Sequence, residues 1–183
     1  MNLTQDPIAA AIYGGIKKGI KVALDNECFG SALILIYTGI DAMANLDRPA
    51  QAQEVRPEDY IRWVDRYIKI SSEVKITAEE FYSARCAVLH TYGVESRSTL
   101  CRGIRKLIYM VGGKPPVRFD PSVNEHLVLL DILAFAEAFF AGLDQFLISV
   151  FADAKRRPIV EARLQQLICV YPQPIAPTFR SGG

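Results

Sequence analysis

Hydrophobic residues recur at helical spacing along the first part of the chain. Residues 7–25 carry them at every fourth position, and Pro7 suits a first helical turn. Residues 28–46 are apolar nearly all round, which is typical of a helix in the middle of a bundle. A polar connection over 47–56 leads to a further helix over about 57–70. The pattern therefore predicts three helices in this part of the chain.

The stretch 77–93 has the clearest start and stop signals of the sequence. Thr77 and Glu80 have the spacing of a capping box, in which each side chain bonds the backbone N–H of the other residue. Gly93 is a natural residue for the left-handed turn that ends a helix. These signals predict a helix over 77–92.

One charged residue interrupts the apolar face of this helix. On a helical wheel Arg85 falls inside the apolar stripe, whereas His90 lies on another side. Burying an unpaired charge is costly, so Arg85 is either paired inside the fold, with Asp41, or faces a partner or substrate. The stripe consists of Phe81, Ala84, Val88, Leu89 and Tyr92, and the side of His90 includes Glu79, Ser83 and Cys86.

After this helix the pattern favours strands. Residues 103–111 are rich in β-branched and aromatic side chains, residues 112–113 are a Gly-Gly turn, and 117–119 form a return strand. Two prolines at 115–116 confine the return strand to a sheet edge. We predict a β-hairpin here, with a helix that continues through Met110 as the alternative.

Residues 123–155 predict the longest helix, and 127–152 are so apolar that a membrane span has to be considered. A central Asp would cost about 2.5–3.5 kcal/mol in a bilayer. Because acidic residues interrupt the stretch, we predict a buried helix of a soluble protein and no membrane span. A last helix is predicted over about 158–170, and an extended or disordered tail over 171–183. The acidic residues are Asp131, Glu137 and Asp144.

Composition narrows the class of protein. The chain has 183 residues, half of them hydrophobic, which favours a single domain over 1–170. Its 21 basic and 20 acidic side chains argue against a strongly cationic nucleic-acid coat protein and against disorder. The four cysteines are scattered and the N-terminus does not resemble a secretory signal, so we predict a reduced, cytoplasmic protein. With only His90 and His126 available, and no phosphate-loop motif, we expect neither a metal centre nor a cofactor.

The run 81–92, with the apolar helix around 40–45 upstream, resembles the HEPN superfamily of small helical-bundle proteins. Its mark is an Arg, four to six intervening residues and a His, which here are Arg85 and His90. The likeness covers roughly residues 7–150. It implies a homodimer in which two such motifs face each other across a two-fold axis. Many members are metal-independent endoribonucleases, and others are inactive RNA-binding or toxin–antitoxin-type partners.

The resemblance implies a chemistry for two residues. His90 would take the proton from a ribose 2′-OH or act as the matching acid, and Arg85 would contact the phosphate oxygens. About 140° separates them around one helix, so a second copy would bring the Arg of each chain toward the His of the other. The position after the Arg is commonly Asn, Asp or His in catalytic relatives, and here it is Cys86, a poorer hydrogen-bond partner.

Further residues are candidates for binding. Asp41 would orient Arg85, and Tyr92 is a packing residue first and a phosphate contact second. Arg97 and Arg102 belong to a basic stretch over 97–106 that could grip an RNA backbone or form a solvated hairpin face.

Together these features predict an all-α, up-and-down, HEPN-like bundle of about five helices with a small β-hairpin after the motif helix. The leading functional prediction is a homodimeric RNA-binding or RNA-processing protein, with endoribonuclease activity at Arg85 and His90. One alternative is a non-catalytic dimer that binds nucleotide, RNA or a protein partner. Another is a purely structural bundle with Arg85 locked in a salt bridge.

Overall fold

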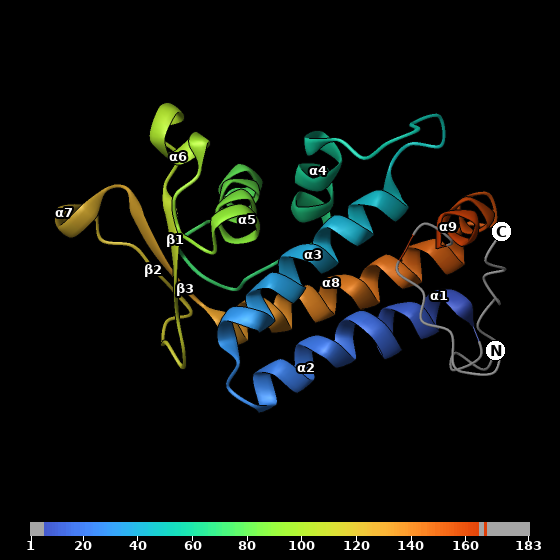
Figure 1. Ribbon diagram of the computed structural model, residues 1–183, viewed down its shortest axis with the longest axis horizontal. Coiled ribbons are helices and arrows are strands. Elements are labelled where there is room, and N and C mark those ends of the chain that lie inside the picture. Colours follow the sequence, from blue (N-terminus) through green and yellow to red (C-terminus); the bar gives the residue numbers. More distant parts are fainter. Residues whose placement is uncertain (1–5, 165–166, 168–183) are drawn as a thin grey trace, which may run out of the picture.

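The computed structural model describes residues 6–164 and 167, without the side chains of Ser98, Cys101 and Arg102. This part of the chain is predominantly helical and includes a small three-stranded mixed sheet (Figure 1). The predicted helical class is confirmed, but the fold is not purely α. The predicted tail over 171–183 and the end of the predicted last helix lie outside the described residues.

The elements follow one another in the order in which they are numbered. The helices are α1 (Pro7–Ala9), η2 (Ala10–Lys17, a π-helix), α2 (Lys18–Asp25), α3 (Phe29–Asp47), α4 (Pro57–Tyr67), α5 (Ala78–Thr91), α6 (Arg97–Arg102), α7 (Pro121–Asn124), α8 (Ile132–Ala152) and α9 (Arg156–Leu164). The strands are β1 (Lys106–Met110), β2 (Val117–Arg118) and β3 (Leu127–Asp131).

The core lies around α3, as its apolar sequence predicts. The continuous helical segment of α1, η2 and α2 and the long helices α3 and α8 run along the long axis of the molecule, and α5 is seen nearly end-on where it crosses them (Figure 1). Phe81 of α5 stacks on Phe135 of α8 with ring centroids 5.0 Å apart. A Cβ at Gly142 would lie 2.9 Å from the carbonyl oxygen of Tyr67, so the glycine allows α8 to approach the end of α4. These contacts fix α5 against the helical core.

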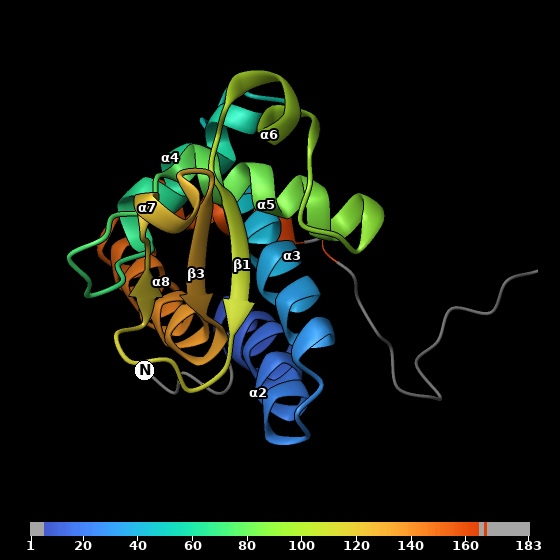
Figure 2. The same ribbon diagram turned by 90° about the vertical axis from the view of Figure 1, so that its left-hand side faces the viewer.

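The predicted β-hairpin is wrong, although both of its strands exist. The sheet order is β1-β3-β2, so β3 lies between the two strands that were expected to pair (Figure 2). β1 pairs with β3 in parallel, starting from Lys106 opposite Leu127, and β2 pairs with β3 antiparallel through Val117 opposite Leu130. The prediction that the proline-flanked strand is an edge strand is confirmed. His126 therefore precedes a strand and does not begin a helix.

The long helix α8 begins at Ile132, nine residues later than the predicted start at residue 123 (132 − 123 = 9). Asp131 separates strand from helix, because its carboxylate accepts from the backbone N–H of Ala134 at 2.9 Å and of Gly113 at 2.8 Å. Its own N–H donates to the carbonyl of Pro116 at 2.7 Å. One residue therefore caps α8 and fastens the loop that joins β1 to β2.

Helix α5 begins as predicted and ends differently. Thr77 and Glu80 form the capping box, with N···O distances of 2.8 and 3.2 Å. The residue in the left-handed conformation is Tyr92, at φ 52°, and not Gly93. The helix therefore ends one residue earlier than the glycine indicates.

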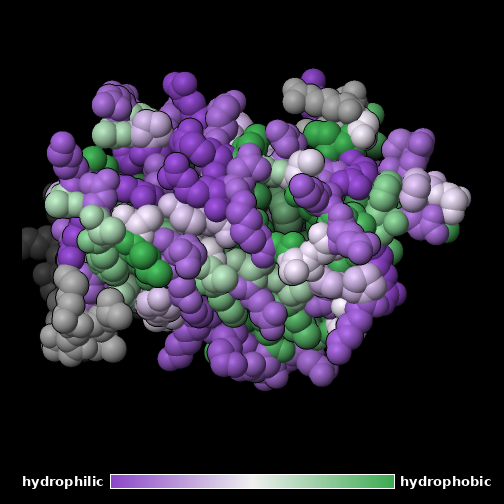
Figure 3. Space-filling view, turned by 180° about the vertical axis from the view of Figure 1, so that it is seen from behind, coloured by the Kyte–Doolittle hydropathy of each residue, from purple (hydrophilic) through white to green (hydrophobic). Residues whose placement is uncertain are grey.

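Two helices of the described chain, α3 and α8, are long and apolar enough to cross a membrane by length and composition. Half of the apolar stretch of each is buried inside the protein, which fits core helices of a bundle. Seen from behind, hydrophilic residues interrupt the hydrophobic ones across the surface (Figure 3). No feature of the described residues requires a bilayer.

Candidate functional site

The centre of the candidate site is an ion pair between α5 and α3. Nε of Arg85 donates to Oδ2 of Asp41 at 2.8 Å, and Nη2 lies 2.7 Å from the same oxygen. The side chains remain 23 and 27 % exposed, so the pair lies at the edge of the core and not inside it. The predicted partner of Arg85 is confirmed. The remaining nitrogen, Nη1, lies 4.0 Å from Sγ of Cys86.

The surroundings shift the pKa of both partners upward. Burial raises the pKa of Asp41, and the hydrogen bond and charge of Arg85, together with the charge of His90, offset only part of that rise. Burial alone would lower the pKa of Arg85, but the hydrogen bond and charge of Asp41 outweigh it and raise the pKa. The guanidinium is therefore a permanent cation held in place by a carboxylate.

His90 lies in the last turn of α5 and is exposed. No hydrogen bond holds its ring among the described residues. The charge of His90 offsets part of the rise that burial causes in the pKa of Asp41, although His90 leaves the helix on another side than Arg85.

Two tyrosines border this pair, and the sequence analysis did not include them in the site. Tyr82 is half-buried, and its pKa is raised by burial and by Cys86. Its ring packs edge-on against Tyr60 with centroids 5.4 Å apart. The Tyr60 hydroxyl is buried without a hydrogen-bond partner among the described residues. Tyr82 precedes Arg85 by three residues and so faces the same way, a signal that could have found it.

Tyr92 does not belong to the buried stripe, which corrects the wheel prediction. The side chain is 69 % exposed, because the left-handed turn at this residue takes it off the helical wheel. Its hydroxyl lies over Gly30 at the start of α3 and leaves no room for a Cβ there. Tyr92 therefore contacts the first turn of α3.

The basic stretch contributes less free charge than the sequence indicates. Arg105 donates to Glu80 at 3.0 Å and to the carbonyl of Lys75 at 2.8 Å, and Lys106 pairs with Glu95. Arg97 is exposed on α6, beyond the loop that follows α5. The Arg102 side chain lies outside the described part. Of the binding candidates, Asp41 and Cys86 contact Arg85, whereas Tyr92 lies against Gly30 and Arg97 is exposed on α6.

Within the described residues, no group of three or more His, Cys, Asp or Glu side chains is placed to hold a metal ion. In comparisons with known proteins, no family model matches the chain, and neither a curated protein nor a solved structure matches it significantly. The HEPN resemblance therefore remains a prediction from the sequence motif.

Three buried tyrosines near the site predict a loss of stability at alkaline pH. The hydroxyls of Tyr37 and Tyr109 hydrogen-bond each other, and burial raises the pKa of Tyr37, Tyr60 and Tyr109. Unfolded tyrosines ionise near pH 10 while the folded ones stay protonated, so the unfolded state binds fewer protons above about pH 10. The free energy of unfolding, measured by urea denaturation, should therefore fall as the pH rises from about 9 to about 11.

Two variants separate the contributions of Tyr37 and Tyr60 to the free energy of unfolding. Tyr37→Phe should lose about 1 kcal/mol near neutral pH, because a buried hydrogen bond is lost. Tyr60→Phe should lose nothing there, because its hydroxyl has no partner among the described residues. Both should lessen the alkaline fall, and a stability that is flat across this range in all three proteins would contradict the account.

Proposed function

We propose that this chain binds RNA and cleaves it without a metal ion, at a composite site to which two copies contribute Arg85 and His90. The supporting observation is the anchored guanidinium. Asp41 holds one edge of Arg85 at a partly exposed surface, and the exposed His90 lies close enough to affect the same carboxylate. A fixed cation beside a free imidazole is what in-line attack on a phosphodiester requires.

The proposed reaction uses the ribose itself as the nucleophile. A base removes the 2′-OH proton, the 2′ oxygen bonds to the adjacent phosphorus, and the bond from phosphorus to the 5′ oxygen breaks. An acid returns a proton to that leaving oxygen, which gives a 2′,3′-cyclic phosphate and a 5′-OH end. At each composite site His90 of one copy, beside Arg85 of the other, can act as the base, and a water molecule can protonate the leaving oxygen. Arg85 contacts the phosphate oxygens as negative charge develops.

The surface around the pair suits a second copy. Ile34 and Ala42 on α3 and Leu89 on α5 are half-buried. Apolar side chains that remain accessible beside a charged site gain free energy when another surface covers them. A two-fold axis over α3 and α5 would bury these residues and bring the two motifs together.

The test is RNA cleavage in the presence of a chelator. We expect the wild-type chain to cut single-stranded RNA to 2′,3′-cyclic phosphate ends with EDTA present. His90→Ala should lower the rate about a hundredfold or more, because a general acid–base group contributes about that much. His126→Ala is the matched control, since His126 is exposed before β3, and it should behave as the wild type. Circular dichroism checks that each variant is folded.

Other outcomes would support the alternative of a purely structural bundle, in which Arg85 only forms a salt bridge. If Arg85→Ala unfolds while His90→Ala is indistinguishable from the wild type in RNA cleavage, the Asp41–Arg85 pair only stabilises the fold. Arg85→Lys separates the two roles, because lysine keeps the charge but cannot form the forked contact to phosphate or carboxylate.

A second function is favoured by the contact at Cys86. Its Sγ lies 4.0 Å from Nη1 of Arg85, where related nucleases commonly carry a stronger hydrogen-bonding side chain. A thiol orients a guanidinium weakly, which suits a dimer that binds RNA without cutting it. RNA binding by the wild type without cleavage, and cleavage that appears in Cys86→Asn, would support this alternative.

A further inference from the structure

The segment between α4 and α5 encloses a cavity away from the Arg85 surface. Along residues 68–76, buried or half-buried apolar and small residues alternate with exposed polar ones, and two of the exposed ones, Lys69 and Lys75, also line the cavity. The cavity has a volume of about 360 Å³, within the range of small-molecule sites. The inward-facing residues are Ile68, Ile70, Ser72, Val74 and Ile76.

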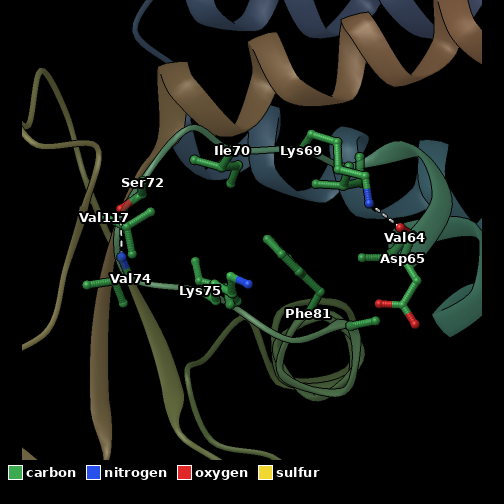
Figure 4. A pocket seen from close by; sticks show the side chains of 12 residues that line it. Val64, Asp65, Lys69, Ile70, Ser72, Val74, Lys75, Phe81 and Val117 are labelled. Carbon is green, nitrogen blue, oxygen red and sulfur yellow. Dashed lines mark hydrogen bonds between the residues drawn. The ribbon is translucent and has the colours of Figure 1, made fainter.

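The floor of the cavity is apolar and comes from three further elements. Val64 of α4, Phe81 of α5 and Val117 of β2 line it, and each is at most 3 % exposed. Figure 4 shows the ring of Phe81 projecting toward the centre of the space that the segment encloses. An apolar group placed against this floor would make van der Waals contacts with hydrocarbon side chains.

The charges that line the cavity are two lysines and one aspartate: Asp65, Lys69 and Lys75. The ammonium of Lys69 is engaged, because it donates to the backbone carbonyl of Asp65. The ammonium of Lys75 has no hydrogen bond or ion pair among the described residues, and Figure 4 shows its side chain at the edge of the enclosed space, between Val74 and Phe81. The lining therefore carries one more cation than anion, and the ammonium of Lys75 is the one without a partner in the described part of the chain, above the apolar floor.

We propose that this cavity binds a small carboxylate with an apolar chain, its hydrocarbon part against Phe81 and Ile70 and its acid group on Lys75. An ammonium at an apolar opening selects an anion, and the charge-assisted hydrogen bond is strongest to a carboxylate or similar oxyanion. The site does not depend on RNA cleavage, and it includes Phe81, one turn before Arg85 on α5.

Decanoate is the probe that tests the site. Calorimetric titration of the full chain should show saturable one-to-one binding, weaker for decanol, which has the same chain without the charge. Lys75→Glu should weaken decanoate binding about tenfold or more, as expected for the loss of a charge-assisted hydrogen bond. Lys18→Glu is the matched control, because Lys18 is an exposed lysine of α2 that does not line the cavity, and it should leave the affinity unchanged.

Two variants fill the space directly. Ala78→Leu adds volume at a buried position in the cavity wall, and Ile70→Trp does so at a half-buried position of the segment that tolerates change more readily. Either folded variant should abolish decanoate binding. Absence of saturable binding to the wild type, or binding that survives Lys75→Glu and a filling variant, would overturn the proposal. Equal affinities for decanol and decanoate would overturn the assignment of a carboxylate.

Discussion

Mixing Arg85→Ala chains with His90→Ala chains is expected to restore RNA cleavage that neither chain shows alone. In a composite site the Arg of one copy acts with the His of the other, so a mixed dimer has one intact site and one empty site. In an equal mixture about half of the dimers are mixed, and cleavage should return to about a quarter of the wild-type rate. The measurement is the rate of RNA cleavage in EDTA after the two proteins are unfolded together and refolded.

The same experiment decides between arrangements of the site. If Arg85 and His90 act within one chain, the mixture stays as inactive as either variant. The control is a mixture of His90→Ala with Asp41→Asn and Arg85→Ala in one chain, which should also recover if Asp41 acts only by orienting Arg85 of its own chain. No recovery in any mixture, with all proteins folded, would contradict the composite site.

Trp63→Ala should cause the largest loss of stability of any single change in the core. The indole is fully buried in α4, and its ring lies 5.1 Å from Tyr67, 6.0 Å from Phe139 and 6.4 Å from Phe146 by centroid. Removing it leaves a cavity at the meeting of α4 and α8, at an expected cost of about 3–5 kcal/mol. Trp63 is the only tryptophan of the chain, so urea unfolding should be followed by circular dichroism.

The variant Trp63→Phe tests whether the loss of stability depends on the volume that is removed. Its ring fills part of the space, and the indole N–H that it removes has no hydrogen-bond partner among the described residues. We therefore expect a loss well below that of Trp63→Ala. Ile148→Ala on α8 is the surface control, because Ile148 is 60 % exposed and such changes cost about 0.5 kcal/mol or less. A Trp63→Ala loss no larger than the Ile148→Ala loss would contradict the packing described here.

Local signals in the sequence were sufficient to predict where a helix begins when the capping residues belong to the helix itself. Thr77 with Glu80 and Pro57 placed the starts of α5 and α4 correctly. The prediction of a β-hairpin was wrong because the pairing of strands depends on residues that are distant in the sequence. The run Leu127–Asp131 is apolar enough for either a helix or a strand, and only the sheet, in which it lies between β1 and β2, makes it a strand.

The candidate site, like the fold, could be predicted from the sequence only in part. A charge on an apolar stripe had to find a partner, and the structure provides Asp41. The exposure of Tyr92 was not predictable, because a wheel assumes helical geometry up to the last residue and this one is left-handed. The pairing of Arg105 with Glu80 likewise depends on where β1 meets α5, which no spacing in the sequence encodes.

Glu80 has one consequence beyond its own helix. Its carboxylate bonds the backbone N–H of Thr77 and the guanidinium of Arg105, which directly precedes β1. The first turn of α5 and the start of the sheet therefore share a single anchor. The position of the helix that carries Arg85 is therefore coupled to the position of the sheet through the carboxylate of Glu80.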